Sequence, residues 1–517
     1  MRVRLRQHVR WQSLGIVALI IAPFLSIASA FFVYSAGIDR LTAAFVNPPY
    51  NTTTFLDVNY TQLNEMENVF EDRLVKYHMP LNFTCTTFFN PVDYDTPTWY
   101  AGGGDTAIQT GLGLATQCFR YATLLQEGNS SGADQSLEVV RRLMNGVSML
   151  LAVPNGGIGP SYSGILARVV APPNSTLVGP LQGLYLGPQA FNGSGAYSGW
   201  QWLGDTSRDQ HAGVFFGLGM VLKFITDPDI RNLACLCVDQ LIQGFQKTGW
   251  IGVDGTGLPT GVDISSNVIG DTEWMLCLLR LGATAYPDKY SALYYHFATS
   301  EMYLNNAKGG SPSNLLIDYY ANTFNWDVFG TLLLLEDNPK IHATYIAKFV
   351  QPFWNIVRYQ RNAYFDAMYA ALTGDTNKTI AEDLGDGLMR FAIDRFPERN
   401  NNYTAVPTWY ATTSTTFLDP LFKDNPFSSV FSSLPGVYNK FDAQYYTQPR
   451  TVDMMPWDWF TWQDNPFSLD SAPSNSTINN GAIESHGLAF TAPYWIGRWA
   501  GVINATGFSP REAFSNG

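Results

Sequence analysis

One pattern recurs along this chain and constrains its fold more than any other feature: a polar turn that runs into an apolar helix rich in glycine and alanine. In 203–218, LGDTSRDQHAGVFFGL, the residues Asp205, Ser207 and Asp209 precede apolar residues at helical spacing. Small polar and acidic residues are favoured there because they accept the unpaired backbone N–H groups of a first turn. The same design returns at 102–125, 270–286, 321–336, 361–375 and 484–503.

Amphipathic segments alternate with these helices. We expect them at 56–77, 137–151, 230–245, 290–305, 342–359 and 379–396. Helices with neighbours on all sides are apolar all round and use glycine for close approach, whereas outer helices keep one polar face. The alternation therefore predicts an all-α fold, an (α/α)6 toroid of six helical hairpins, with almost no strand except in two long loops.

The two long loops, 154–204 and 397–481, are expected to lie over one end of this barrel. In an alternating ring every inner helix runs in the same direction, so the polar N-termini of the inner helices meet at one end. A single acidic turn of this kind usually does no more than cap its helix and pair with a neighbour such as Arg208. Because six such turns meet at one end of the ring, together they predict one pocket. Long loops in compact domains are usually functional, which supports a pocket at the end that these two loops cover.

The N-terminus has the pattern of a targeting signal. Residues 1–13 carry four arginines and no acid, and 14–36 form an uncharged run about long enough to span a bilayer. This pattern predicts either a signal anchor, with the N-terminus in the cytosol, or a signal peptide that is cleaved after Ala28-Ser29-Ala30. In the first case the chain is attached to a membrane through this helix.

The rest of the chain shows no linker. No charge run, Ser/Pro-rich tract or low-complexity stretch interrupts it, although its length would ordinarily suggest several domains. We therefore divide the chain into an N-terminal segment at 1–36, a stalk at 37–55 and a single toroid domain at 56–517. The oligomeric state does not follow from the sequence.

Asn-x-Ser/Thr sequons are dense in this chain and predict an extracellular or cell-surface glycoprotein of the secretory pathway. Charged residues make up only 14% of the chain, and glycans would supply solubility. The net charge of −12 argues against nucleic acid or an anionic lipid surface as a partner. The predicted glycosylation sites are Asn51, Asn59, Asn82, Asn129, Asn174, Asn192, Asn377, Asn402, Asn475 and Asn504.

Five cysteines in 517 residues do not make a disulfide framework. Cys235, Cys237 and Cys277 lie within apolar helical runs, where a small buried thiol is the expected state. Only Cys85 and Cys118 remain as a candidate disulfide. The chain has no CxxC or HExxH motif and only six histidines, so we expect no metal site and no cofactor.

Four stretches of the chain carry a resemblance to a known superfamily: GDTAIQTGLGLATQCFRYA (104–122), SRDQHAGVFFGLGM (207–220), PWDWFTWQDNPFSL (456–469) and PYWIGRWAGV (493–502). With them the chain resembles the six-hairpin glycosidase-like superfamily, and in particular a largely uncharacterised group of such domains. The resemblance covers nearly all of the chain beyond residue 95. It implies the (α/α)6 toroid more securely than it implies a reaction, since this superfamily also holds polysaccharide lyases, sugar epimerases and non-sugar enzymes. A carbohydrate is the expected substrate or ligand.

Aromatic residues gather in the loops on the pocket side and support a sugar ligand, because a flat ring offers the apolar face on which a pyranose stacks. About half of them are expected to be core residues that hold the loops down. His211 is as well explained by a structural role in its turn. The candidate substrate-binding residues are Trp99, Tyr100, Trp202, Arg208, Gln210, His211, Trp457 and Trp462.

Hydrolysis of a glycosidic bond requires one carboxylic acid to protonate the leaving oxygen and one carboxylate to activate water or attack the anomeric carbon. Asp105 and Asp209 are the candidate catalytic pair, because each begins a predicted inner helix in a motif that carries the resemblance. Asp271 and Glu273 on the next inner helix are the reserve pair. Resemblance to many six-hairpin hydrolases implies an inverting mechanism.

Three functions stay open on the sequence alone. The first is a surface-anchored or secreted glycoside hydrolase. The second is a non-catalytic surface or assembly glycoprotein that uses the toroid as a scaffold. The third is a polysaccharide lyase, which needs a base and a group that neutralises a uronate carboxylate; Arg208 and His211 are available, but no basic cluster is.

Overall fold

The computed structural model describes residues 45–48, 54–101, 103–175, 178–184, 190–265, 272–306, 319–391, 405–414, 444–455, 465–469 and 482–504. The N-terminal segment at 1–36 and most of the stalk lie outside these residues. Within the described part of the chain, no helix is both long enough and apolar enough to cross a membrane.

The structure is mostly helical, which confirms the all-α prediction, and every polar-start segment contains a helix. These helices are buried almost all round; each residue of the first one from Thr106 to Leu124 is buried. They are called inner helices here: α3 (Thr106–Gln126), α5 (Arg208–Phe224), α7 (Thr272–Ala285), α11 (Ala321–Leu334), α14 (Ala363–Thr373) and α18 (Leu488–Trp499).

The segments between the inner helices are also helical, with two breaks that the pattern did not predict. The segment expected at 290–305 is two helices, and the one expected at 342–359 has a π-helical turn at Ile346–Val350. These outer helices are α2 (Tyr60–Tyr77), α4 (Ser130–Asn155), α6 (Pro228–Lys247), α8 (Pro287–Ala298), α9 (Glu301–Asn306), α12 (Pro339–Tyr345), α13 (Gln351–Val357) and α15 (Lys378–Met389).

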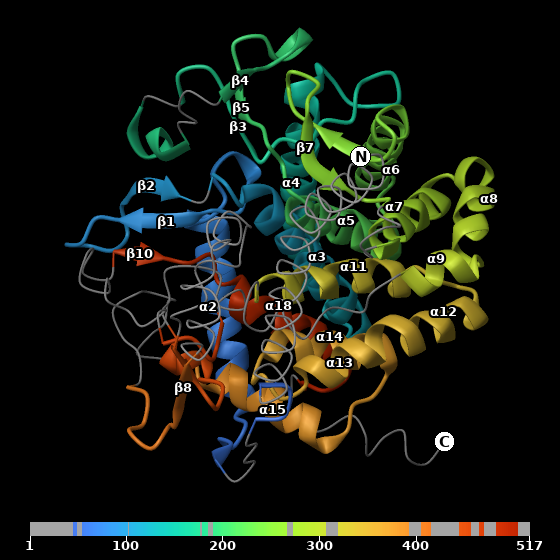
Figure 1. The fold of residues 1–517 in the computed structure, drawn as a ribbon. Coiled ribbons are helices and arrows are strands. Elements are labelled where there is room, and N and C mark those ends of the chain that lie inside the picture. Colours follow the sequence, from blue (N-terminus) through green and yellow to red (C-terminus); the bar gives the residue numbers. More distant parts are fainter. Residues whose placement is uncertain are drawn as a thin grey trace, which may run out of the picture.

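Each inner helix contacts the next one along the chain. The contacts run from α3 to α5, then to α7, α11, α14 and α18, and α18 returns to α3. In Figure 1 the first outer helix α2 (blue) and the last inner helix α18 (red) lie side by side, and the two are in contact. Two helices that lie far apart in the sequence therefore pack together.

Glycine sets the closeness of α3 and α5. A Cβ atom at Gly111 would overlap the carbonyl group of Gly213, and a Cβ atom at Gly217 would lie 2.7 Å from the carbonyl oxygen of Gly111. Any side chain there would force the two backbones apart. This contact fixes the first turn of α5 beside the first turn of α3, where the candidate acids lie.

Short strands lie in more of the connections than we expected. Two sheets belong to the two long loops, as predicted. They are the three-stranded sheet β3–β5–β4 (Val169–Ala171, Gln201–Leu203 and Ala190–Asn192) and the two-stranded sheet β8–β9 (Thr412–Ser414 and Gln444–Tyr446). Two further sheets, at the left and upper right of Figure 1, do not. They are β10–β1–β2 (Ile483–Glu484, Thr86–Phe89 and Pro97–Ala101) and β6–β7 (Ile251–Val253 and Pro259–Asp263).

The confinement of strands to the long loops was therefore wrong. The segments TTFF at 86–89 and PTWYA at 97–101 are rich in β-branched and aromatic residues, which favour a half-buried pleated surface. In β1, Thr87 pairs with both Tyr100 of β2 and Glu484 of β10. This register joins the connection before α3 to the connection before α18.

The candidate disulfide is not formed. Cys85 and Cys118 are both free and buried, Cys118 within the core of α3. Burial raises the pKa of the Cys85 thiol to about 12, although the hydrogen bond with Thr106 opposes this rise. A thiol in such surroundings acts as a small apolar side chain, which explains both residues without a bridge.

The described sequons lie at or near the surface. Asn59, Asn129, Asn174, Asn192 and Asn377 are exposed, Asn82 and Asn504 are half-buried, and Asn51, Asn402 and Asn475 lie outside the described residues. Three of them also cap outer helices. The side-chain oxygens of Asn59, Asn129 and Asn377 accept the backbone N–H of Gln62, Gly132 and Ile380 at the starts of α2, α4 and α15.

Candidate functional site

The first turns of α3 and α5 bring the two candidate catalytic acids together. Asp105 occupies the N-cap position of α3, and Asp209 lies in the first turn of α5. Between them stands the buried amide of Gln210. Its Nε2 donates to Asp105 Oδ1 at 3.1 Å and lies 3.5 Å from Asp209 Oδ2, so one nitrogen is in reach of both carboxylates.

The carboxylate of Asp105 does not cap its own helix, although it stands at the N-cap position. The cap comes from the neighbouring helix instead, because Gln210 Oε1 accepts the backbone N–H of Ile108 at 3.1 Å. That N–H is the one that an N-cap side chain ordinarily satisfies. Gln210 thus caps α3 from α5 and leaves the carboxylate of Asp105 available for other contacts.

The electrostatics of this pair raise the pKa of Asp105. Burial is the larger cause and the charge of Asp209 the second, while Arg168 and the hydrogen bond from Gln210 oppose them. Both acids are only half-buried, so each retains access to solvent. Two carboxylates in such proximity hold a proton more tightly than one alone, which is the arrangement that general acid catalysis requires.

Arg168 is a positioning residue of this site that the sequence did not reveal. Its Nη1 donates to the Gly104 carbonyl at 2.9 Å, its Nε to the Asp205 carbonyl at 2.8 Å and its Nη2 to Ser207 Oγ at 2.9 Å. One guanidinium thus ties the turn before α3 to the turn before α5. It is a single arginine in a 51-residue loop, 154–204, and no pattern in the sequence indicates its contacts.

Gln210 and His211, both expected to bind sugar hydroxyls, have other partners. The Gln210 amide is used within the site, as described, and its side chain is fully buried. His211 is 3% exposed, with Nδ1 2.9 Å from the Ser207 carbonyl and its ring against Phe215 and Phe245. Burial lowers the pKa of His211 to about 4, so the imidazole is neutral near pH 7.

A small pocket borders the first turn of α5 on the side of His211. It measures about 100 Å³ and lies among α5, the end of α6, the loop before β3 and the β6–β7 hairpin. Its lining residues are Ser163, Gly164, Ile165, Leu166, Thr206, His211, Gly244, Phe245, Lys247, Thr248, Ile251, Gly252, Val253 and Thr260.

The candidate aromatic platforms divide into exposed and core residues. Trp99 on β2 is 46% exposed, and its neighbour Tyr100 is half-buried. Trp202 is 2% exposed; its ring stacks on Phe191 at 4.7 Å and its Nε1 donates to the Asn192 carbonyl at 3.1 Å. Trp202 therefore holds the β3–β5–β4 sheet, and its prediction as a sugar platform was wrong.

The remaining predicted residues are only partly placed. Arg208 is half-buried, with its guanidinium carbon 5.9 Å from the centre of the Trp274 ring. Glu273, in the first turn of α7, is 1% exposed. Asp271, Trp457 and Trp462 lie outside the described residues.

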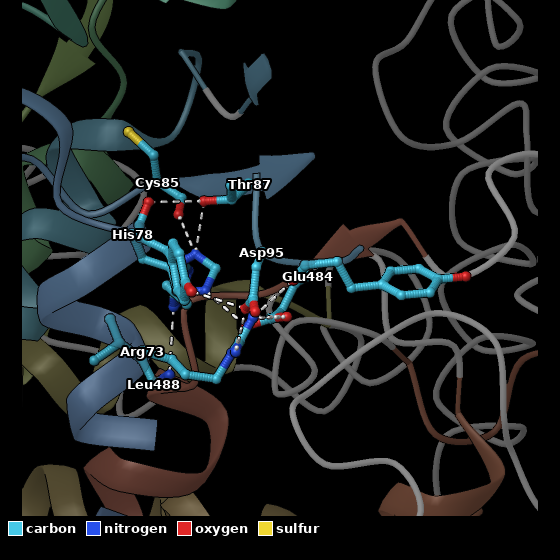
Figure 2. Close-up of polar contacts among 10 residues, drawn as sticks. Arg73, His78, Cys85, Thr87, Asp95, Glu484 and Leu488 are labelled. Carbon is cyan, nitrogen blue, oxygen red and sulfur yellow. Dashed lines mark hydrogen bonds and ion pairs between the residues drawn. The ribbon is translucent and has the colours of Figure 1, made fainter. Parts of the chain in front are cut away.

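A second polar cluster lies around Glu484 of β10 (Figure 2). Arg73 of α2 donates through Nε to Glu484 Oε1 at 2.5 Å and through Nη2 to Glu484 Oε2 at 2.8 Å. His78 Nε2 lies 3.1 Å from the same Oε1, and His78 Nδ1 lies 2.9 Å from Thr87 Oγ1. This cluster joins α2, β1 and β10.

The order hydroxyl, imidazole, carboxylate in this cluster is also the order of a nucleophilic triad. Thr87, His78 and Glu484 are each at most 1% exposed, however, and Thr87 Oγ1 donates to the Tyr77 carbonyl at 3.1 Å. No substrate reaches a hydroxyl that is buried and already donating. The cluster therefore has a structural role, in which it holds α2, β1 and β10 together.

No group of three or more histidine, cysteine, aspartate or glutamate side chains in the described residues is arranged to hold a metal ion. Comparisons with family models, curated proteins and solved structures find no match to this chain. The six-hairpin resemblance thus rests on the motifs alone.

Proposed function

We propose that the protein is a glycoside hydrolase whose catalytic pair is Asp105 and Asp209. One observation carries the proposal: Asp105 stands at a helix N-cap, yet Gln210 does the capping and the carboxylate faces a second acid. An acid that only stabilised its helix would accept the N–H of Ile108 itself. The arrangement supplies two carboxylates at one half-buried place, which is the minimum that glycosidic hydrolysis needs.

The two acids take different roles in this proposal. Asp105 is the general acid, because burial and the charge of Asp209 raise its pKa and keep its proton available for the leaving oxygen. Asp209 is the carboxylate that activates water or attacks the anomeric carbon. Gln210 and Arg168 position the pair, and Trp99 is the exposed ring on which a sugar would stack.

The spacing of the pair bears on the stereochemical outcome. Asp105 Oδ1 and Asp209 Oδ2 share one nitrogen at 3.1 and 3.5 Å, so their separation cannot exceed these two lengths laid end to end. Inverting enzymes separate their two carboxyl groups by roughly 6.5–9.5 Å and retaining enzymes by about 5–5.5 Å. Both separations are compatible with these two contacts, and the anomeric form of the first product distinguishes the two outcomes.

The wider architecture in this proposal is the (α/α)6 toroid. Its support is the succession of contacts from α3 through α5, α7, α11 and α14 to α18 and back to α3, with the outer helices between them in the chain. In such a ring the first turns of the inner helices lie at one end. The site would then open at that end, below the long loops.

We also propose that the domain acts outside the cell or at its surface. The support is the apolar run at 14–36 and the density of sequons, of which five in the described residues are exposed. Removal of N-glycans from protein made in a native source should lower its mass by several glycans. An unchanged mass would contradict this placement.

A matched set of three variants tests the catalytic pair. Asp209 and Asp229 occupy the same position in the first turns of the successive helices α5 and α6, but Asp229 is exposed and far from Asp105 in the chain. With a panel of oligosaccharides, Asp105→Asn and Asp209→Asn should each reduce kcat about 10²–10⁴-fold at an unchanged melting temperature. Asp229→Asn should leave kcat unchanged.

Three results would contradict the proposal. Full activity in either Asn variant would remove the pair from the reaction. Glycan binding by the wild type with no cleavage of any panel member would favour the scaffold glycoprotein. Products with a new carbon–carbon double bond, seen by their ultraviolet absorbance, would favour the lyase.

A further inference from the structure

We propose that the pocket beside His211 receives the acetamido group of an N-acetylated amino sugar, so that glycans containing such sugars are the substrate class of the neighbouring carboxylate pair. This inference rests on the proposed function for the reaction, but not for the binding. Its basis is the size of the pocket, the chemistry of its wall and its position at the first turn of α5.

The size of the pocket selects a small group. Its volume is about 100 Å³. A cavity of about 150 Å³ holds benzene, so this pocket accommodates less than a six-membered ring. A whole pyranose does not fit, whereas a substituent such as the planar acetamido group does. The pocket is therefore a recess for one substituent of a larger ligand.

The wall of the pocket is apolar because most of its polar atoms already have partners. Thr206 Oγ1 donates to the Leu166 carbonyl, Thr260 Oγ1 to the Thr206 carbonyl at 3.2 Å and Thr248 Oγ1 to the Ile251 carbonyl at 2.5 Å. The hydroxyl groups thus point into the structure rather than at a ligand. The methyl group of an acetamide gains from such a wall, whereas an ordinary sugar hydroxyl would lose its water there.

His211 supplies a directional contact in this wall. Its Nδ1 faces the Ser207 carbonyl and therefore carries the proton, and in the described residues no hydrogen bond is made to its Nε2. Because the buried ring is neutral, this Nε2 is an acceptor. An acetamide N–H is the matching donor, and the exposed ammonium group of Lys247, which also lines the pocket, can donate to the acetamide carbonyl.

The pocket and the carboxylate pair share the first turn of α5. His211 follows Asp209 by two residues, so the two side chains point to different sides of the helix. A ligand that lies across the end of α5 reaches both. The charges of Asp209 and Arg168 act on the His211 ring, which places it in the same electrostatic environment as the pair. In a 2-acetamido sugar the ring carbon that bears the acetamido group is bonded to the anomeric carbon, which is where hydrolysis occurs.

Two disaccharides test the inference directly. N,N′-diacetylchitobiose and cellobiose have the same β-1,4-linked backbone and differ in their two acetamido groups. By ligand-observed NMR and calorimetry with the full chain, the wild type should bind diacetylchitobiose more tightly, by on the order of tenfold, from one buried methyl group and one hydrogen bond. The acetyl methyl signal should show the strongest saturation transfer.

Two variants locate that preference in the pocket. His211→Ala removes the acceptor. Val253→Phe fills the pocket from β6 and leaves His211, Asp105 and Asp209 unchanged. In each variant the affinity for diacetylchitobiose should fall to about that for cellobiose, and the affinity for cellobiose should stay unchanged. If the His211 variant fails to fold, the Val253 variant carries the test by itself.

The results separate this inference from the hydrolase. Equal binding of the two disaccharides, or a preference that survives in Val253→Phe, overturns the acetamido pocket even if other glycans are cleaved. A preference that is lost in both variants, with no cleavage of any glycan, supports the pocket and overturns the hydrolase. Cleavage of diacetylchitobiose by the wild type, and by Asp229→Asn but not Asp209→Asn, supports both.

Discussion

Glu484 and Asp105 are both acids close to the start of an inner helix: Glu484 lies in β10 shortly before α18, and Asp105 is the N-cap residue of α3. Their carboxylates have opposite kinds of partner. Glu484 is 1% exposed and accepts two hydrogen bonds from Arg73 and one contact from His78 (Figure 2). Asp105 is half-buried and accepts from the neutral amide of Gln210, with a second acid beside it. One carboxylate is paired with the guanidinium of Arg73, and the other lies beside a neutral amide and a second acid.

The pKa values of the two acids move in opposite directions as a result. Burial raises the pKa of Glu484, but hydrogen bonds and charges from His78 and Arg73 outweigh it and the net shift is downward. For Asp105, burial and the charge of Asp209 outweigh Arg168, and the net shift is upward. The chain thus stabilises the ionised form of the structural acid and the protonated form of the candidate catalytic acid.

The largest effect on stability is expected at the structural acid. Glu484→Gln removes the buried partner of the ion pair with Arg73, whose side chain is 15% exposed, and removal of one partner from a buried pair costs up to about 3–5 kcal/mol. Denaturant unfolding would measure this loss. The control is Asp95→Asn, because Asp95 also faces Arg73, at 3.7 Å, but is 66% exposed and should contribute less than about 1 kcal/mol. Equal losses in the two variants would contradict the role of burial.

The next effect is expected at the amide that holds the candidate acids. Gln210→Leu leaves the backbone N–H of Ile108 without its acceptor and should lower the free energy of unfolding by about 1–3 kcal/mol. It should also reduce hydrolysis, since the amide would no longer hold Asp105 beside Asp209. The control Gln246→Leu changes an exposed glutamine on α6 and should do neither. A Gln210 variant with full activity would show that the two acids do not depend on this amide.

The difference between the two acids marks the limit of what the sequence predicts. Helical spacing and polar starts predicted the inner helices and the acids at their first turns, because such signals are local. The partner that decides the chemistry of each acid is distant: Gln210 lies 105 residues from Asp105, and Arg73 lies 411 residues from Glu484. No periodicity in the sequence indicates either pair.

The errors have the same physical origin. An aromatic residue in a loop can stack on a ligand or on its own loop, so the sequence predicts Trp202 as a sugar platform, and only the contact with Phe191 distinguishes the two. The sequence leaves Cys85 and Cys118 as a candidate disulfide, although a thiol in α3 and one before β1 are both stable as buried apolar groups. Packing between distant segments decides such cases.

A smaller effect is expected where a helix caps itself. Asn129 Oδ1 accepts the N–H of Gly132 at 3.0 Å in α4, so Asn129→Ala should lower the free energy of unfolding by about 0.5–2 kcal/mol. Asn129→Asp retains the acceptor and should retain the stability. Ser131→Ala removes the sequon but not the cap, so measurements on unglycosylated protein should show no loss. A loss in Ser131→Ala as large as that in Asn129→Ala would assign the effect to something other than the cap.

The smallest change in stability is expected at Asp105, and its sign makes the comparison decisive. At neutral pH Asp105→Asn should alter the free energy of unfolding by no more than about 0.5 kcal/mol, because no cation depends on this carboxylate for its only countercharge.

A raised pKa means that the folded state binds the proton more tightly, so the contribution of Asp105 to stability grows as pH falls towards about 3.9, its ordinary pKa. A lowered pKa means the reverse: the contribution of Glu484 is complete above about 4.3, its ordinary pKa, and is lost as pH falls below it. On acidification from pH 7 to 3.5, the stability of the wild type should therefore rise relative to Asp105→Asn and fall relative to Glu484→Gln. Differences that change in the same direction for both variants would show that the two acids are held alike, and would remove the reason to assign the proton of the reaction to Asp105.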